Sequence, residues 1–365
     1  MSDWTGISNA SAIPWLLERN NSPVRYYTLL SLLGYSQKDS DVVEAKKSIN
    51  SDSRIIRILS KQNPEGFWES SAEPYLPKYK SSYWQVMILG MLGLDKSNPN
   101  VKKAVEHVFK FQHPEGGFTE YGEEGALREY HHRKERMKKK GREMPPAKDW
   151  IQKQVHDSQL TCLTGNMCLA LIRLGYSADK RVKRALDWLM RVQNEDGGWL
   201  CPYWNAHAKD KHGCFMGTIT PLDAFSEIPS QNRTAGMTKS MESGIEFLLM
   251  HHLFRSDHHD FRVINESWLT MGFPQFFYDI LRGLSVICKS GYGDDRRIDQ
   301  ALEVLIKKQH RGTWVLESSP VGRMQTNLEQ KNKPSKWITL KALEVIKSVQ
   351  ETRGSVLLNH IDGSP

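Results

Sequence analysis

Hydrophobic residues recur along the chain with the spacing of amphipathic helices, and four of these segments end in the same kind of turn. In residues 184–199, Ala185, Leu186, Leu189 and Val192 follow helical periodicity and lead into Gln193, Gly197 and Trp199. Three other segments repeat this order of helix, Gln, short polar turn, Gly and aromatic residue. They end in Gln62, Gly66 and Trp68, in Gln112, Gly117 and Phe118, and in Gln309, Gly312 and Trp314.

Between these turns lie segments that are apolar on all sides, such as residues 82–92, which is typical of helices buried in a core. They alternate with the amphipathic segments. Repeats of this size predict stacked units, because one unit alone cannot bury its apolar face. The sequence therefore predicts an all-α fold of parallel inner helices and about six outer helices, an (α/α)6 toroid. The six inner helices are expected to begin near Val24, Ser82, Gln159, Leu222, Gln275 and Lys336.

Helix starts are marked by proline and by capping residues. Thr220-Pro221, Phe273-Pro274 and Lys333-Pro334-Ser335 place proline at or near a first turn, and Asp157-Ser158 resembles a cap for the next helix. The N-termini of parallel inner helices would gather at one mouth, where their partial positive charge favours an anion.

We expect one domain over residues 1–365, with a basic insertion at about 120–154 and a flexible tail at about 352–365. The net charge is +8, and Arg128 to Lys148 holds nine Lys or Arg residues against three Glu. The insertion is either a lid that neutralises an anionic substrate or a mobile, solvated excursion. No nucleic-acid reading motif accompanies it, so a nucleic-acid partner is not expected.

The Gln, Gly and aromatic turn resembles the repeat of squalene and oxidosqualene cyclases and of protein prenyltransferase β subunits. Cys162-Leu-Thr-Gly-Asn-Met, Leu253-Phe-Arg-Ser and Pro334-Ser-Lys-Trp resemble bacterial single-domain squalene-cyclase-like proteins of unassigned function. The resemblance implies an isoprenoid-processing enzyme, for prenyl transfer or cyclisation, acting on an apolar substrate with or without a diphosphate. Two alternatives stay open: a non-catalytic binding module for a polyanion or a protein, and a polysaccharide-processing enzyme.

Three aspartates are candidates for catalysis. Squalene-type cyclases protonate their substrate from an Asp-x-Asp-Asp motif, which this chain lacks. Asp279 is expected in the second turn of an apolar inner helix, where desolvation would suit a general acid; the alternative is a salt bridge with Arg282 or Lys336. Asp223 has a similar position near a helix start, and Asp157 precedes the candidate metal ligand Cys162.

Cysteines and a histidine predict a zinc site. Cys162 lies in the first turn of an inner helix, and Cys201, His212 and Cys214 lie on the connector to the next. A catalytic Zn²⁺ takes three such ligands and keeps one open position. Prenyltransferases bind zinc through Asp, Cys and His, with Asp and Cys two apart, whereas Asp157 and Cys162 are five apart. The alternative is that the thiols are core residues and the histidine faces solvent.

Further side chains could bind the substrate. Trp84, Asn166, Phe277, Tyr278 and Trp337 fall on expected inner helices, where aromatic rings either stabilise a carbocation or simply fill the core. Arg255 and His258 belong to a polar cluster that either holds a phosphate or forms a plain solvated loop.

Cysteine usage and the termini suggest a compartment. Five cysteines, an odd number, suit a reducing cytoplasm. The sequence shows no apolar run long enough for a membrane span and no signal-peptide pattern at its start, so we expect a cytoplasmic protein. Peripheral contact with a membrane stays open.

Overall fold

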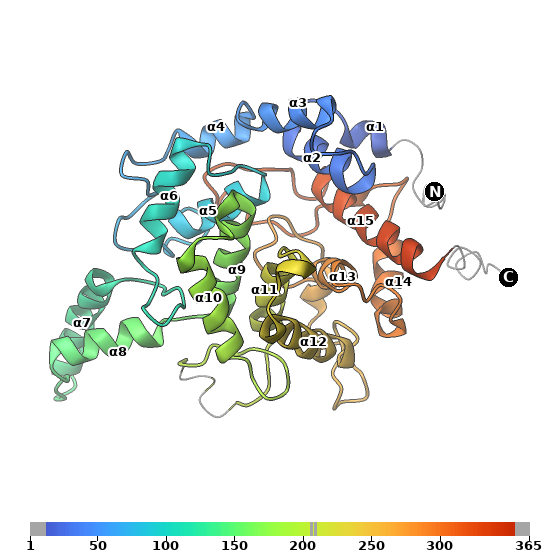
Figure 1. The fold of residues 1–365 in the computed structure, drawn as a ribbon. Helices are drawn as coiled ribbons and strands as arrows, with labels where there is room; N and C mark the ends of the chain where they lie inside the picture. The colour runs from blue at the N-terminus through green and yellow to red at the C-terminus, as the bar shows by residue number, and fades with distance from the viewer. Residues whose placement is uncertain (1–11, 205–206, 208–209, 355–365) are drawn as a thin grey trace. The chain divides into compact units, whose positions relative to one another are not determined.

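The computed structural model describes residues 12–204, 207 and 210–354, and its regular structure is almost entirely helical (Figure 1). The predicted all-α class is confirmed. A two-residue antiparallel pair, β1 (Trp314–Val315) with β2 (Pro334–Ser335), is the small exception. The helices are α1 (Ala12–Leu16), α2 (Ser22–Tyr27), α3 (Ser40–Ile49), α4 (Ser53–Leu59), α5 (Ser82–Met91), α6 (Pro99–Phe109), α7 (Glu123–Lys138), α8 (Ala147–Asp157), α9 (Thr161–Leu171), α10 (Lys180–Arg191), α11 (Phe215–Ser226), α12 (Ala235–Met250), α13 (Ile280–Lys289), α14 (Asp299–Lys307) and α15 (Lys336–Arg353).

The chain divides into two compact units. Unit 1 takes Met1–Ile56, Ile245–Gly322 and Thr326–Pro365, and unit 2 takes Arg57–Gly244 and Arg323–Gln325. Each unit has its own set of inner and outer helices. The arrangement of the whole chain as one domain stays a prediction.

The inner helices of unit 2 are α5, α9 and α11, and they run parallel. Gly90 near the end of α5 lies against Ala170 near the end of α9, so close that a Cβ on Gly90 would meet the Ala170 carbonyl oxygen at 3.0 Å. Gly165 in α9 faces Thr220 in α11, and Arg173 beyond α9 pairs with Asp223 at 3.7 Å. Contacts therefore advance in the same direction along neighbouring helices, as predicted.

The inner helices of unit 1 are α2, α13 and α15. Lys336 at the start of α15 donates to Glu18 just before α2 at 2.8 Å, and Lys347 later in α15 donates to the Ser31 carbonyl just beyond α2 at 2.9 Å. The ring of Phe273, which precedes α13, stacks on Trp337 at the start of α15. These inner helices are also parallel, as the repeat predicted.

The repeated glutamine joins three of the turns to the next outer helix. Gln193 Nε2 donates to the Gly197 carbonyl at 2.7 Å within its own turn and to the Ser240 carbonyl of α12 at 2.9 Å. One side chain thus satisfies two backbone acceptors that belong to different elements. The same two bonds recur from Gln62 to Gly66 and Asn100, and from Gln112 to Gly116 and Arg181.

The glycine of the turn is required by conformation and by space. Gly197 has φ +87°, and a Cβ there would stand 2.4 Å from the Ser243 carbonyl oxygen. Gly66 and Gly116 have equally close backbone neighbours on the next outer helix. The aromatic residue then packs inward: Trp199 is fully buried, and its Nε1 donates to the Leu189 carbonyl at 2.7 Å.

Two of the predicted helix starts and one predicted cap are wrong. Helix α11 begins at Phe215, so Pro221 lies inside it. Helix α13 begins at Ile280 instead of near Gln275, which makes Asp279 its N-cap and not a second-turn residue. Asp157 is the last residue of α8, and the N-cap of α9 is Leu160, without a capping side chain. In contrast, Ser335 caps α15 by accepting from Ile338 N.

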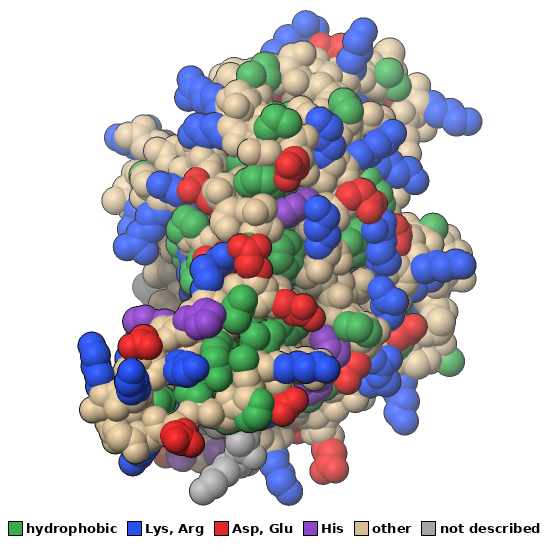
Figure 2. All heavy atoms as spheres, turned by 90° about the vertical axis from the view of Figure 1, so that its left-hand side faces the viewer, with side chains coloured by type: hydrophobic (Ala, Val, Ile, Leu, Met, Phe, Trp, Pro, Cys, Tyr) green, Lys and Arg blue, Asp and Glu red, His purple; other side chains and the backbone are tan. Residues whose placement is uncertain are grey.

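The insertion at about 120–154 contains α7 and most of α8, which pack on each other and project from the rest of unit 2 (Figure 1). Ala126 and Tyr130 of α7 are buried, while most of its charged residues are exposed. Figure 2 shows that Lys and Arg side chains in this region are interspersed with Asp and Glu. The predicted tail begins at the end of α15, and residues 355–365 lie outside the described residues.

None of the described helices is both long and apolar enough to cross a membrane.

Candidate functional site

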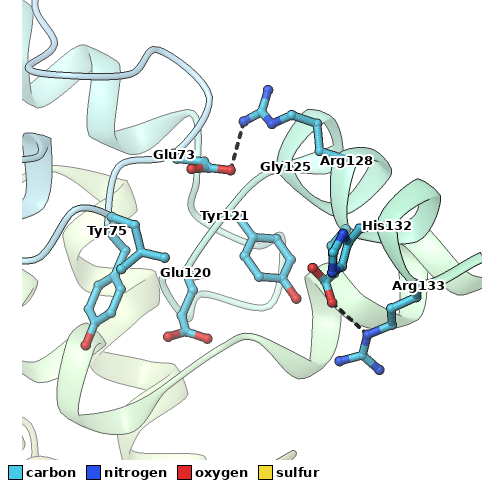
Figure 3. Close-up of a pocket in the computed structure, with 10 residues that line it drawn as sticks. Glu73, Tyr75, Glu120, Tyr121, Gly125, Arg128, His132 and Arg133 are labelled. Atoms are coloured by element: carbon cyan, nitrogen blue, oxygen red, sulfur yellow. Dashed lines mark hydrogen bonds and ion pairs between the residues drawn. The ribbon is translucent and has the colours of Figure 1, made fainter. Parts of the chain in front are cut away.

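A pocket of about 510 Å³ opens in unit 2 between the start of the insertion and the connector before α5 (Figure 3). Its volume lies within the range of small-molecule sites. Carboxylates, tyrosines, arginines and a histidine make up most of its wall. The lining residues are Glu73, Tyr75, Leu76, Glu120, Tyr121, Gly125, Arg128, Glu129, His132 and Arg133.

Glu120 and Tyr75 lie at the inner end of this pocket, and backbone contacts fix their positions. Glu120 follows Thr119, which bridges to Gln159, and Glu120 N donates to the Ser158 carbonyl at 3.2 Å. Tyr75 is held by Trp84, whose Nε1 donates to the Tyr75 carbonyl at 2.8 Å and whose ring lies 5.3 Å from the Tyr75 ring. Figure 3 shows the Tyr75 hydroxyl and the Glu120 carboxylate pointing to the same side, with Tyr121 directed toward α7.

The arginines of the insertion are neutralised within the pocket wall. Arg128 pairs with Glu73 at 3.0 Å and with Glu124 at 2.7 Å, and Arg133 pairs with Glu129 at 2.7 Å. These guanidinium groups are therefore already engaged by carboxylates. This arrangement does not favour the predicted role of the insertion as a grip for an anionic substrate.

Glu120 is the acid of this pocket. Burial raises its pKa, the charge of Cys201 raises it further, and Lys78 acts in the opposite direction. Burial also raises the pKa of Tyr75, as do the charges of Cys162 and Glu120. A carboxyl group with a raised pKa retains its proton to higher pH, which suits a general acid.

Two of the predicted metal ligands, Cys162 and Cys201, lie within electrostatic reach of Tyr75, and Cys201 also within reach of Glu120. Cys162 at the start of α9 and Cys201 hydrogen-bond to each other through their side chains, and Cys214 lies near enough to influence both. The bond from Cys162 lowers the pKa of Cys201, against the effect of burial. All five cysteines are free thiols.

His212 is placed apart from this thiol cluster. Its side chain is exposed, and its Nδ1 faces the Gly213 carbonyl at 3.1 Å and Asp196 at 3.6 Å. Among the residues that the structure describes, no set of three ligand atoms within 4.8 Å of one another includes any of the three cysteines. The predicted four-residue zinc set is therefore not assembled as a compact group.

Asp279 is buried, as expected, but it serves as a cap. Its carboxylate accepts from Arg282 N at 2.8 Å and from Gly272 N at 2.9 Å. Burial raises its pKa to about 6, although both hydrogen bonds and the Arg282 charge oppose the shift. The expected alternative partner Lys336 instead contacts Glu18 and Asn20. A catalytic role for Asp279 stays a prediction.

The other two aspartates are held by cations. Asp223, buried in α11, lies 3.7 Å from Arg173. Asp157 pairs with Lys153 at 2.6 Å and with His156 at 3.0 Å. Burial acts to raise the pKa of Asp157, but these partners outweigh it and the pKa is lowered. A lowered pKa makes Asp157 a poor proton donor near neutral pH.

The predicted substrate-binding residues have different surroundings. Trp84 and Asn166 are buried on α5 and α9, and Trp337 is buried on α15 against Phe273. Phe277 lies before α13 and is 46% exposed, so its expected place on an inner helix is wrong. Tyr278 also precedes α13, and its buried hydroxyl donates to the Leu253 carbonyl.

Arg255 and His258 belong to the predicted polar cluster in unit 1. Arg255 donates to Gln300 and, at 2.7 Å, to the Phe261 carbonyl. His258 is exposed and lies 3.4 Å from Asp257. Phosphate binding by these two residues stays a prediction.

Tyr75, Glu120 and Tyr121 were not predicted from the sequence. Glu120 and Tyr121 directly follow the Gln112 to Phe118 turn, and Tyr75 lies in the connector after the Trp68 turn. Residues that follow a repeated turn lie at the same end of neighbouring inner helices. Their position after a repeated turn is therefore the sequence signal that could have predicted that these three residues lie close together.

Comparison with known proteins finds structural similarity alone. Type II terpene cyclase MstE from Scytonema shares 15% sequence identity with a TM-score of 0.43, over 91% of this chain and 87% of that chain. A protein from Actinoplanes shares 12% identity with a TM-score of 0.45, over 93% and 99% of the two chains. No protein-family model and no curated protein sequence matches the chain.

Both TM-scores are below 0.5, so these similarities carry no argument about this chain and assign no role to any of its residues. The functional argument therefore rests on the residues themselves.

Proposed function

We propose that the protein is an enzyme that protonates an apolar, isoprenoid-type substrate in the pocket at Glu120. The observation that supports it is the placement of the Glu120 carboxyl group in a pocket of about 510 Å³ with the rings of Tyr75 and Tyr121. An acid, aromatic rings and a small-molecule volume are the elements that cyclisation by protonation needs.

The reaction that these groups fit is a proton-initiated ring closure. The proton of Glu120 adds to one carbon of an alkene, and the resulting carbocation is attacked by a second double bond of the same substrate. The electron-rich faces of Tyr75 and Tyr121 stabilise the cation. Loss of a proton from the cyclic product to the Glu120 carboxylate restores the acid.

A diphosphate on the substrate is not supported by the pocket wall. Arg128 and Arg133 would be the diphosphate ligands from the insertion, and each is paired with a glutamate. A diphosphate would have to compete with those glutamates for the guanidinium groups. We therefore favour a substrate whose reactive part is neutral.

The test is turnover in D₂O by purified protein with linear prenyl compounds. Geranylgeranyl dihydroxybenzoate, the substrate in one structure of the Scytonema cyclase, is one probe. We expect a cyclic isomer that carries one deuterium from solvent, and its loss in Glu120→Gln. Glu135→Gln, at an exposed position of α7 outside the pocket lining, is the matched control and should retain activity. No turnover of any prenyl probe, or an unaffected Glu120→Gln, contradicts the proposal.

A polysaccharide-processing enzyme is the second candidate, because three glutamates, two tyrosines and a histidine line the same pocket. Pairs of carboxylates carry out glycoside hydrolysis in many enzymes. Chain shortening of an oligosaccharide that depends on Glu120, with no isomerisation of prenyl compounds, would favour this candidate.

A further inference from the structure

Three cysteines from separate segments of unit 2 lie near one another beside the start of α9. Cys162 is the second residue of α9, Cys201 follows the Trp199 turn, and Cys214 is the N-cap of α11. An antiparallel bridge between Trp199 and Cys214, with Cys214 N donating to the Trp199 carbonyl at 3.0 Å, brings the last two segments together.

The sulfur atoms are surrounded by hydrogen-bond donors. Cys214 Sγ accepts from Gly217 N at 3.0 Å, and Thr161 Oγ1 lies 3.6 Å from Cys201 Sγ. Backbone N–H groups of Leu163 and of Thr161 contact the sulfurs of Cys162 and Cys201. Donors of this kind stabilise negative charge on sulfur and orient it, as the outer partners of a metal site do.

The two remaining cysteines have different surroundings. Cys168 on α9 and Cys288 on α13 are buried, and burial is the leading cause of the raised pKa of each thiol. No neighbouring thiol contributes to the raised pKa of either residue. The clustering is therefore a property of three particular cysteines and not of buried cysteines in this chain generally.

We propose that Cys162, Cys201 and Cys214 bind one thiophilic divalent cation of the Zn²⁺ class. Thiolate sulfur selects Zn²⁺ over the hard cations Mg²⁺ and Ca²⁺, and three sulfurs leave one position of a tetrahedral ion for water or another ligand. Glu120 and Tyr75 interact electrostatically with Cys201. The open position of the ion would therefore lie near these two residues, at the inner end of the pocket.

Binding requires a small movement, because the three sulfurs are not all within 4.8 Å of one another. Cys162 and Cys201 already touch, so Cys214 is the residue that has to approach. Its side chain is half-buried, and a change of χ1 rotamer, which gives up the hydrogen bond from Gly217 N, moves the sulfur by about 3 Å. The three sulfurs would therefore come together only when the ion binds.

The inference does not depend on prenyl chemistry at Glu120, and its test uses no enzyme assay. Full-length protein without an affinity tag is prepared metal-free, loaded with Zn²⁺, desalted and measured for metal content. It is also titrated with Co²⁺ while thiolate-to-metal absorption is recorded. We expect one Zn²⁺ per chain and the absorption of a tetrahedral cobalt thiolate.

Single variants then assign the ligands. Cys162→Ser, Cys201→Ser and Cys214→Ser should each weaken metal binding at least tenfold, because each removes one bond to the ion. Cys168→Ala, a buried cysteine on the same helix as Cys162, is the matched control and should bind as the wild type does.

Two results would overturn the inference: less than a tenth of an equivalent of Zn²⁺ on the wild-type chain, or equal binding by Cys168→Ala and all three serine variants. Should a serine variant fail to fold, the cobalt spectrum of the wild type decides. Absorption from thiolate ligands supports the site, and its absence refutes it.

Discussion

The repeated turn makes a quantitative prediction, because two glycines of unit 2 have nearly the same φ but differ in their neighbours. Gly197 has φ +87° and Gly175 has φ +89°. At Gly197 an added Cβ would stand 2.4 Å from the Ser243 carbonyl oxygen. At Gly175 the nearest atoms are 3.6 Å away, on the flexible side chain of Lys96.

Alanine at either position has to adopt a positive φ, which costs about 1 kcal/mol or somewhat more. At Gly175 this is the whole expected cost, because the added methyl group makes an ordinary contact. At Gly197 the methyl group forces the turn away from α12. That displacement adds about 1–3 kcal/mol of overpacking and weakens the Gln193 bonds to Gly197 and Ser240.

The assay is urea unfolding of Gly197→Ala and Gly175→Ala, followed by circular dichroism and by tryptophan fluorescence. We expect Gly197→Ala to lose about 2–4 kcal/mol of unfolding free energy and Gly175→Ala about 1 kcal/mol. Equal losses would refute the argument, because they would mean that φ alone, and not the approach to Ser243, requires glycine at position 197.

Three further variants extend these arguments. Trp199→Phe leaves the Leu189 carbonyl without its Nε1 donor and should lower the unfolding free energy, measured in urea, by about 2 kcal/mol. Its control is Trp204→Phe, which should lower the unfolding free energy little because Trp204 is 54% exposed. Gln193→Ala, which removes two hydrogen bonds, should cost about 1–3 kcal/mol, against almost nothing for the exposed Gln152→Ala. Burial raises the pKa of Asp279 to about 6 in the folded state, from about 4 when unfolded, so the folded state holds this proton more tightly. Its contribution to the unfolding free energy therefore falls by about 3 kcal/mol in total as the pH rises from well below 4 to well above 6, and by about 2 kcal/mol between pH 4.5 and 7. Asp279→Asn lacks this titration, so its difference in unfolding free energy from the wild type should change with pH. A constant difference between pH 4.5 and 7 would contradict the raised pKa of Asp279.

The sequence by itself predicted the repeat and the class of fold. Apolar segments without a polar face predicted the buried inner helices, and the Gln, Gly and aromatic residues marked the turns. These signals are local, since helical periodicity and the order of residues in a turn are read within one helix and the turn that follows it. The hydrogen bond from Gln193 to the Gly197 carbonyl, four residues further on, lies within this local pattern.

Only the tertiary structure showed which distant groups meet. That the second partner of Gln193 is Ser240 on the next outer helix follows from packing and not from local pattern. Asp279 looked like a residue inside a helix because the apolar run continues on both sides of it, yet two backbone donors make it the cap.

The candidate site depends on tertiary structure even more. The basic insertion appeared to be free positive charge, but Arg128 and Arg133 are paired with Glu73 and Glu129. Glu120 carried no sequence motif, and its raised pKa comes from burial produced by segments far from it in the chain. Desolvation and ion pairing depend on which side chains share a volume of space, and a one-dimensional pattern does not specify that.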